Sequence, residues 1–303
     1  MKYINDIKEL IGNTPLMKLH NMGLKKGVHI FAKLECFNPG GSVKDRIGLY
    51  MIEGAEKAGL LKPGYTIVEA TAGNTGLGVA MAALNKGYHI LFVVPTKFSM
   101  EKQTLMRALG ATVINTPREK GMLGAVEKAK ELLAEIPNSI SLEQFQNPNN
   151  PLAHYEGTGP EIYEALEGKI DYYVGGAGSG GTYSGVMKYL REKNVAVKGI
   201  LADPVGSTMG GGEAACYNIE GIGNDFIPAT MDMSLVDEVI KINDDEALKY
   251  TRLLAAKEGL IVGASSGAAL AAAMKLADRL ESGNVVTLFS DRGDRYLSKG
   301  IFD

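Results

Sequence analysis

The stretch TIVEATAGNTGLGVAMAALNKGYHILFVVP, residues 66–95, decides the fold class. Its two ends, TIVEA and HILFVVP, are short apolar runs of the kind that form buried strands. Between them, AGNTG supplies turn residues, and NTGLGVAMAALNKG has apolar residues at helical spacing. A strand, a helix and a second strand in this order build a parallel sheet that is covered by helices. The sequence therefore predicts an α/β fold.

The same alternation continues along the chain. Further strands are expected at ATVINT, IDYYVGG, VKGILADP and NVVTLFS, and further helices at SMEKQTLMRALG, GMLGAVEKAKELLAEI, GPEIYEALEG, residues 183–193, DDEALKYTRLLAAKEG and SSGAALAAAMKLADRL. FQNPNNPLAH, residues 145–154, has several turn-forming breaks and predicts a crossing between domains. We expect two doubly wound lobes with mainly parallel sheets and a cleft between them.

Composition restricts the class of partner. The chain has 303 residues, 45% of them hydrophobic, and a net charge of −3 with no long basic run, which argues against nucleic acid or an anionic membrane. Cys36 and Cys216 form no CxxC pair, so a reducing cytoplasm is the expected compartment. The histidines show no paired ligand spacing, and no metal site is expected. A small-molecule ligand fits these observations best.

The clearest ligand loop is GGAGSGGTYSG, residues 175–185, between an expected strand and an expected helix. Glycines there allow backbone N–H groups to converge on a phosphate at a helix N-terminus, while tight turning alone is the structural alternative. Gly176, Gly178 and Gly181 also spell GxGxxG, and Asp203 ends the next expected strand. An NAD-dependent oxidoreductase is therefore a rival interpretation.

Two other loops lie in equivalent places. EATAGNTG, residues 69–76, offers backbone donors to a carboxylate, and the Asn74 amide is placed to bond a phenolic oxygen. VGASSGAA, residues 262–269, places Ser265 or Ser266 at a helix start, where either hydroxyl contacts a ligand or simply caps the helix.

Lys44, in NPGGSVKDR (residues 38–46), is expected in the first turn of a helix. A cation there is unfavourable by roughly 0.3–1 kcal/mol at an exposed site, although a solvated surface lysine is common. Taken with the three loops, Lys44 suits a protein that handles an amino acid with a phosphate-bearing aldehyde.

The chain strongly resembles the β-family, or fold type II, of pyridoxal-phosphate enzymes, the cysteine synthase and cystathionine β-synthase group. The resemblance runs nearly end to end. It is carried by IGNTPL (11–16), NPGGSVKDR (38–46), EATAGNTG (69–76), QFQNPNNP (144–151), TGPEI (158–162), GSGGT (178–182), SSGAA (265–269) and RYLS (295–298). It implies pyridoxal 5′-phosphate as cofactor in the cleft, a smaller mobile domain over residues 40–145, and a larger cofactor-phosphate domain over residues 1–39 and 146–303.

The resemblance also implies residue roles. Lys44 forms the Schiff base and is the catalytic base, Asn74 bonds the cofactor's 3′ oxygen, and Ser265 faces the pyridine nitrogen. The cofactor phosphate is held by Gly178, Ser179, Gly180, Gly181 and Thr182, and the substrate carboxylate by Thr71, Ala72, Gly73, Thr75 and Gln144. A neutral partner for the pyridine nitrogen favours β-elimination over transamination.

One departure refines the comparison. Ala72 replaces the serine of the usual TSGNTG loop, which puts that residue's share of carboxylate binding in doubt. With Ala72, GSTMGGG (206–212) and Asp291, the chain resembles bacterial O-acetylserine-dependent cystathionine β-synthases more than typical cysteine synthases. We therefore expect β-replacement on O-acetylserine, or serine, by homocysteine, with Asp291 contacting the homocysteine amine and sulfide as a second thiol.

Other interpretations remain open at this point. Cysteine synthase is the main alternative, and a binding module that keeps the fold without catalysis is a remote one. The family also implies a homodimer, while a partner serine acetyltransferase cannot be read from the sequence.

Overall fold

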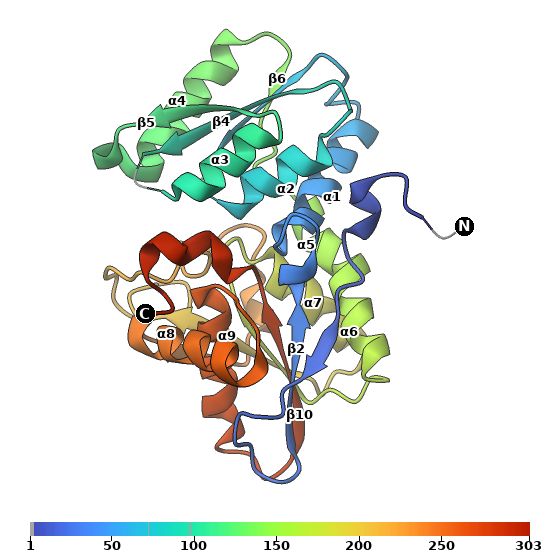
Figure 1. The fold of residues 1–303 in the computed structure, drawn as a ribbon. Helices are drawn as coiled ribbons and strands as arrows, with labels where there is room; N and C mark the ends of the chain where they lie inside the picture. The colour runs from blue at the N-terminus through green and yellow to red at the C-terminus, as the bar shows by residue number, and fades with distance from the viewer. Residues whose placement is uncertain (1–2, 72, 97) are drawn as a thin grey trace. The chain divides into compact units, whose positions relative to one another are not determined.

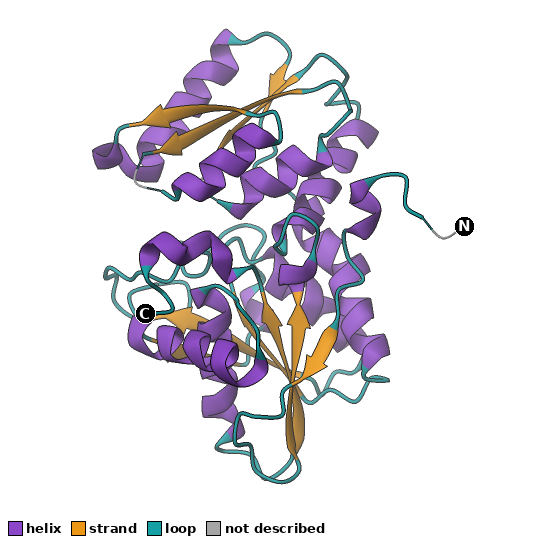
Figure 2. Cartoon of the chain, viewed as in Figure 1, coloured by secondary structure: helices purple, strands orange, loops and turns teal. Residues whose placement is uncertain are grey.

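The computed structural model describes residues 3–71, 73–96 and 98–303, which form two compact α/β units. Unit 1 comprises Met1–Ile11 and Lys44–Asn150, and unit 2 comprises Gly12–Val43 and Pro151–Asp303. Each unit has its own sheet with helices beside it (Figure 2). The segment that ends at Ile11 groups with unit 1, whereas the sequence placed it in the larger domain. Lys8 Nζ donates a hydrogen bond to the Leu84 carbonyl (3.3 Å), which ties this segment to unit 1.

The sheet of unit 1 has the strand order β5-β4-β3-β6, with parallel neighbours. Its strands are β3 (Thr66–Ala70), β4 (His89–Pro95), β5 (Thr112–Thr116) and β6 (Ser139–Ile140). Its helices are α1 (Lys44–Lys57), α2 (Asn74–Ala82), α3 (Met100–Ala108) and α4 (Gly121–Glu135).

The chain reverses its direction across this sheet after β5. Through α2 and α3 it steps from β3 to β4 to β5, and α4 then returns it to the far side of β3, where β6 pairs. Right-handed crossovers place α4 on the face opposite α2 and α3, as Figure 1 shows. Ala125 and Ala129 of α4 pack against Val68 and Val93. The ends of β3 and β6 therefore meet at a topological switch point, where α/β sheets bind ligands.

The sheet of unit 2 has the order β1-β2-β10-β7-β8-β9, in which β1 is antiparallel to β2 and the other pairs are parallel. Its strands are β1 (Leu16–Lys18), β2 (Val28–Leu34), β7 (Tyr172–Gly176), β8 (Lys198–Pro204), β9 (Glu238–Ile242) and β10 (Gly283–Phe289). Its helices are α6 (Gly159–Ala165), α7 (Gly181–Lys193), α8 (Asp244–Leu253) and α9 (Ala264–Ala277). A second switch point lies between β7 and β10.

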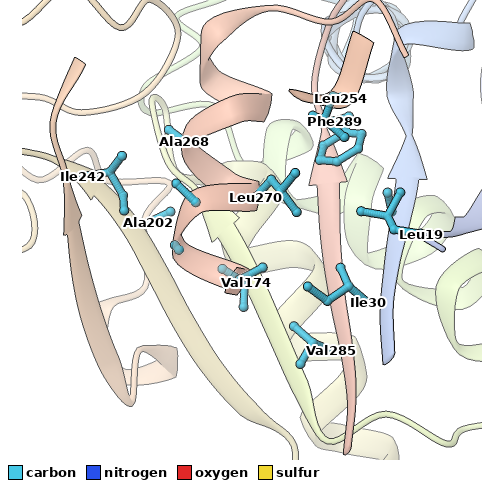
Figure 3. Packing of buried hydrophobic residues seen from close by; sticks show 14 of the residues in the cluster. Leu19, Ile30, Val174, Ala202, Ile242, Leu254, Ala268, Leu270, Val285 and Phe289 are labelled. Atoms are coloured by element: carbon cyan, nitrogen blue, oxygen red, sulfur yellow. The ribbon is translucent and has the colours of Figure 1, made fainter. Parts of the chain in front are cut away.

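Alternate strand residues of unit 2 face two separate cores. Tyr173, Leu201 and Val286 pack with α7 on one face. On the other face Val174 and Val285 pack with α9, whose small side chains let it lie close to the sheet (Figure 3). This period of two is what a strand buried on both faces requires.

The expected strands and helices are present, and the α/β fold with mainly parallel sheets is confirmed. Strands β1, β2, β6 and β9 were not predicted. The segment expected as a crossing is helical in part, because α5 (Asn149–Ala153) runs into a π-helical turn, His154–Thr158, and then into α6. In the described part of the chain, no helix has the length and hydropathy to cross a membrane.

Candidate active site

Lys44 is the first residue of α1, as predicted, and its backbone is held against α2. A Cβ at Gly78 would lie 2.2 Å from the Lys44 carbonyl oxygen, and a Cβ at Gly48 would lie 2.3 Å from the Gly78 carbonyl carbon. The two helices therefore cross with their backbones in direct contact, which requires glycine at both positions. This crossing fixes the point from which the Lys44 side chain extends.

The predicted carboxylate loop leads from β3 into α2. Gly73 is the N-cap of α2, and Asn74 is its first residue. No side chain of the described residues caps this helix, so the N–H groups of its first turn are suited to an anion. Thr71 is 3% exposed and Thr75 8%, so both hydroxyls are largely shielded from water. Ala72 lies outside the described residues.

Gln144, which follows β6, meets this loop. Thr75 Oγ1 donates to Gln144 Oε1 (2.7 Å), and Asn150 Nδ2 donates to the Gln144 carbonyl (2.7 Å). Thr75 and Gln144 thus lie together at the switch point, although 69 residues separate them in sequence. The arrangement is consistent with the predicted carboxylate clamp.

The predicted phosphate loop leads from β7 into α7. Gly180, the N-cap, has φ +84°, and a Cβ there would lie 2.4 Å from the Met231 Cβ. A Cβ at Gly178 would lie 2.4 Å from the Gly221 carbonyl oxygen. These two glycines are therefore required by the fold of the loop itself, and not only by a ligand.

The orientation of this loop suits a phosphate. Asn224 Nδ2 donates to the Gly178 carbonyl (2.5 Å), and Thr230 Oγ1 donates to the Ser179 carbonyl (2.5 Å). In a trans peptide the next N–H points opposite to the carbonyl, so the N–H groups of Ser179 and Gly180 point away from these two side chains. No side chain of the described residues caps α7. Its N-terminus can thus present N–H donors and the positive end of the helix dipole to an anion.

His154 lies beside the predicted phosphate loop and was missed by the sequence reasoning. It is 0% exposed, its Nε2 lies 3.1 Å from Thr182 Oγ1, and its Nδ1 lies 2.8 Å from Thr158 Oγ1. It therefore orients one of the predicted phosphate ligands. In the sequence, His154 stands just before TGPEI (158–162), and no local pattern pairs it with Thr182, which lies 28 residues further on. In the structure it is the first residue of the π-helical turn His154–Thr158.

Ser265 is buried in the first turn of α9, and it is not the N-cap. That position belongs to Gly263, so the interpretation of Ser265 or Ser266 as a cap is wrong. Ser265 Oγ lies 2.8 Å from Ser290 Oγ, and Ser266 Oγ accepts from the Ser290 N–H (3.1 Å). Ser290 follows β10, next to the switch point of unit 2. Ser265 therefore presents a neutral hydroxyl, held by a second hydroxyl, with no carboxylate bonded to it in the described contacts.

Asp291 lies deeper than the sequence suggested. It is 1% exposed, and its Oδ2 accepts from the Tyr296 hydroxyl (2.5 Å). Burial and the Asp291 carboxylate raise the pKa of Tyr296, which stays a neutral donor. A Cβ at Gly263 would lie 2.4 Å from Asp291 Oδ1, so the start of α9 is built around this carboxylate. The predicted contact with the homocysteine amine stays a prediction, and the burial favours a supporting position.

Asp203, the acid of the NAD interpretation, has another role. Its Oδ2 accepts from Lys241 Nζ (2.5 Å) and from the Gly210 N–H (3.0 Å), and the residue is 1% exposed. It is therefore engaged inside the protein and is not placed to bind a ribose. Two glycines of the GxGxxG pattern have structural causes: Gly178 as described above, and Gly176, where a Cβ would lie 2.6 Å from Ile222 Cγ2.

A lysine and an amide at two helix starts of unit 1, and in unit 2 a glycine loop suited to an anion and a buried neutral serine, are the groups expected in a class of protein that holds a phosphate-bearing aldehyde. The family model "Pyridoxal-phosphate dependent enzyme" matches residues 7–291. The chain belongs to this family and is a pyridoxal-phosphate-dependent enzyme that acts on amino acids. The NAD interpretation and the binding module are therefore set aside.

Individual relatives are similar over the full length. The O-acetylserine dependent cystathionine β-synthase of Bacillus subtilis (strain 168) is 51% identical, covering 100% of this chain and 99% of the relative. A cysteine synthase of Helicobacter pylori (strain 26695) is 48% identical over 100% of both chains. The crystal structure of the O-acetylserine dependent cystathionine β-synthase from Helicobacter pylori superposes with a TM-score of 0.95, 47% identity and full coverage of both chains.

Proposed function

We propose that the protein replaces the acetoxy group of O-acetylserine with the thiol of homocysteine, giving cystathionine and acetate, and that it accepts sulfide as a smaller thiol. The observation that carries this proposal is the full-length similarity to the Bacillus subtilis protein. Acetate is a weaker base than the hydroxide lost from serine, so the acetylated substrate needs less activation.

The cofactor, when bound, supplies an electron sink that makes the substrate α-proton acidic and lets the β-substituent leave. Lys44 would hold it covalently, and the Lys44 amine would take the substrate α-proton as general base. Asn74 would bond its ring oxygen, and the loop Gly178–Thr182 would hold its phosphate. The geometry of the loop fits this role, since its carbonyls are already bonded to Asn224 and Thr230.

The substrate carboxylate is held by the first turn of α2 together with Thr71, Thr75 and Gln144. The shielding of Thr71 and Thr75 from water strengthens charge-assisted hydrogen bonds to the carboxylate. Ser265 would face the ring nitrogen with a neutral hydroxyl, which would not hold a proton on that nitrogen. Loss of the β-substituent is therefore favoured over transamination.

The test is a comparison of steady-state rates with O-acetylserine and either homocysteine or sulfide, with cystathionine and cysteine measured by mass spectrometry. We expect cystathionine as the main product at equal thiol concentrations. Cysteine formation without cystathionine would instead assign cysteine synthase, the activity that gives the Helicobacter pylori relative its name.

Asp291 tests how the larger thiol is recognised. If its carboxylate bonds the homocysteine amine, Asp291→Ala raises KM for homocysteine far more than for sulfide, because a charged hydrogen bond of roughly 1.5–3 kcal/mol is lost with one thiol alone. Tyr296→Phe is the matched control, since it removes the Tyr296 hydrogen bond and keeps the carboxylate. Equal effects of Asp291→Ala on both thiols would make Asp291 a supporting residue.

We also propose that the enzyme is a homodimer in the cytoplasm. The free thiols of Cys36 and Cys216, the latter exposed, are consistent with a reducing compartment. A serine acetyltransferase as the source of O-acetylserine is a chemical expectation, and copurification tests whether it binds.

A further inference from the structure

The switch point of unit 1 contains a carboxylate that the proposed mechanism does not use. Glu69 is the fourth residue of β3, two residues before Thr71. The ladder between β3 and β6 covers Thr66↔Ser139 and Ile67↔Ile140, and it stops where β6 ends. Beside Glu69, the chain that follows β6 therefore no longer pairs with β3 as a strand.

The Glu69 side chain replaces the missing part of this ladder. Its Oε1 accepts hydrogen bonds from Ser141 Oγ (3.0 Å), from the Leu142 N–H and from the Glu143 N–H (3.3 Å). Three donors on consecutive residues thus converge on one oxygen. A partly buried carboxylate with this set of donors restrains the path of the 141–143 segment.

Gln144 is the next residue of that segment. Its side chain meets Thr75 and its carbonyl accepts from Asn150, so its position depends on the path of the three residues before it. We propose that Glu69 is a positioning residue for the substrate carboxylate clamp: by holding residues 141–143, it sets Gln144 beside Thr75. This inference rests on the proposed role of Thr75 and Gln144 in binding the substrate carboxylate.

Burial and hydrogen bonds act in opposite directions on the pKa of Glu69. Burial raises the pKa of Glu69 to about 7, against the lowering effect of the bonds from Leu142, Ser141 and Glu143, and the Glu143 carboxylate adds a smaller upward shift. A carboxyl at this position supplies an acceptor with several lone pairs for the three donors, which no apolar side chain would supply.

The test compares Glu69→Gln and Glu69→Ala with the wild-type enzyme loaded with cofactor. Glutamine keeps one acceptor oxygen at the same reach, and alanine keeps none. We expect KM for O-acetylserine to rise by about tenfold in Glu69→Ala, which corresponds to about 1.4 kcal/mol, and to rise less in Glu69→Gln. Cofactor content and the KM for the thiol stay near wild type, since the Lys44 helix and the phosphate loop are untouched.

Glu135→Gln is the matched control, because it removes an equal charge from an exposed position of the same unit outside the 141–143 segment. Its KM for O-acetylserine should equal that of the wild type. If Glu69→Ala does not fold, the KM of Glu69→Gln for O-acetylserine tests the proposal instead, and a rise above the wild-type value supports it. A lower melting temperature with an unchanged KM in both Glu69 variants would make Glu69 purely structural and overturn the proposal. If the wild type neither turns over O-acetylserine nor binds it, the proposed function itself fails, which is a different result.

Discussion

The crossing of α1 and α2 gives the sharpest prediction about Lys44, and the change that tests it is Gly78→Ala. A Cβ at Gly78 would lie 2.2 Å from the Lys44 carbonyl oxygen and 2.7 Å from its carbonyl carbon. An ordinary carbon–oxygen contact is about 3.3 Å or more, so the helices must separate by about 1 Å. Because both partners are backbone atoms, no rotamer change relieves the overlap.

The energy follows from two opposing effects. Overpacking costs about 1–3 kcal/mol, and backbone overlap belongs at the upper end. Replacing glycine by alanine inside a helix returns about 1 kcal/mol. The net destabilisation is then about 2 kcal/mol, or a fall in melting temperature of about 4–8 °C. A displacement of about 1 Å at a catalytic group also costs about a hundredfold in turnover.

Calorimetry and the cystathionine assay measure the two effects. The control is Glu53→Ala, at an exposed position of α1, which should change stability by no more than about 0.5 kcal/mol. An unchanged melting temperature and turnover in Gly78→Ala would refute the reasoning that this crossing positions Lys44.

Four further predictions concern other parts of the site. Lys44→Ala should abolish turnover, and after borohydride reduction mass spectrometry should find the cofactor covalently attached to the wild type alone. Ser265→Asp should lower the β-replacement rate by at least about tenfold, because an anion favours a protonated ring nitrogen; Ser265→Ala, which adds no charge, should lose much less. Gly180→Ala should raise the cofactor dissociation constant, since φ is +84° there and a Cβ would overlap the protein; a wild-type constant would show that the loop tolerates the change. Burial raises the pKa of Cys36 to about 12, so at neutral pH and up to well above it this thiol stays protonated and unreactive. Iodoacetamide should therefore label only the exposed Cys216 in the native protein, and early labelling of Cys36 would contradict its burial.

Local patterns in the sequence were sufficient for most of the fold. Most strands and helices from β3 onward were expected because their apolar periodicity is a local property of the chain. Strand β9, EVIKI, and strand β2, VHIFAKL, were missed, since short runs with charged residues gain their strand character from the neighbours with which they pair. The position of Lys44 at a helix start also followed from local turn and helix signals.

The arrangement within the candidate site depended on tertiary structure. Thr75 and Gln144 were both predicted from motifs, but only the strand order β5-β4-β3-β6 brings them to hydrogen-bonding distance across 69 residues. Glu69 looked like an ordinary strand residue until the early end of β6 left it facing the 141–143 segment. By itself the sequence determined which chemistry the chain carries, because motifs are local. The burial of Asp291 and the pairing of Ser265 with Ser290 were decided by the tertiary structure, because hydrogen bonds between distant segments depend on how strands are ordered in a sheet, which no local pattern specifies.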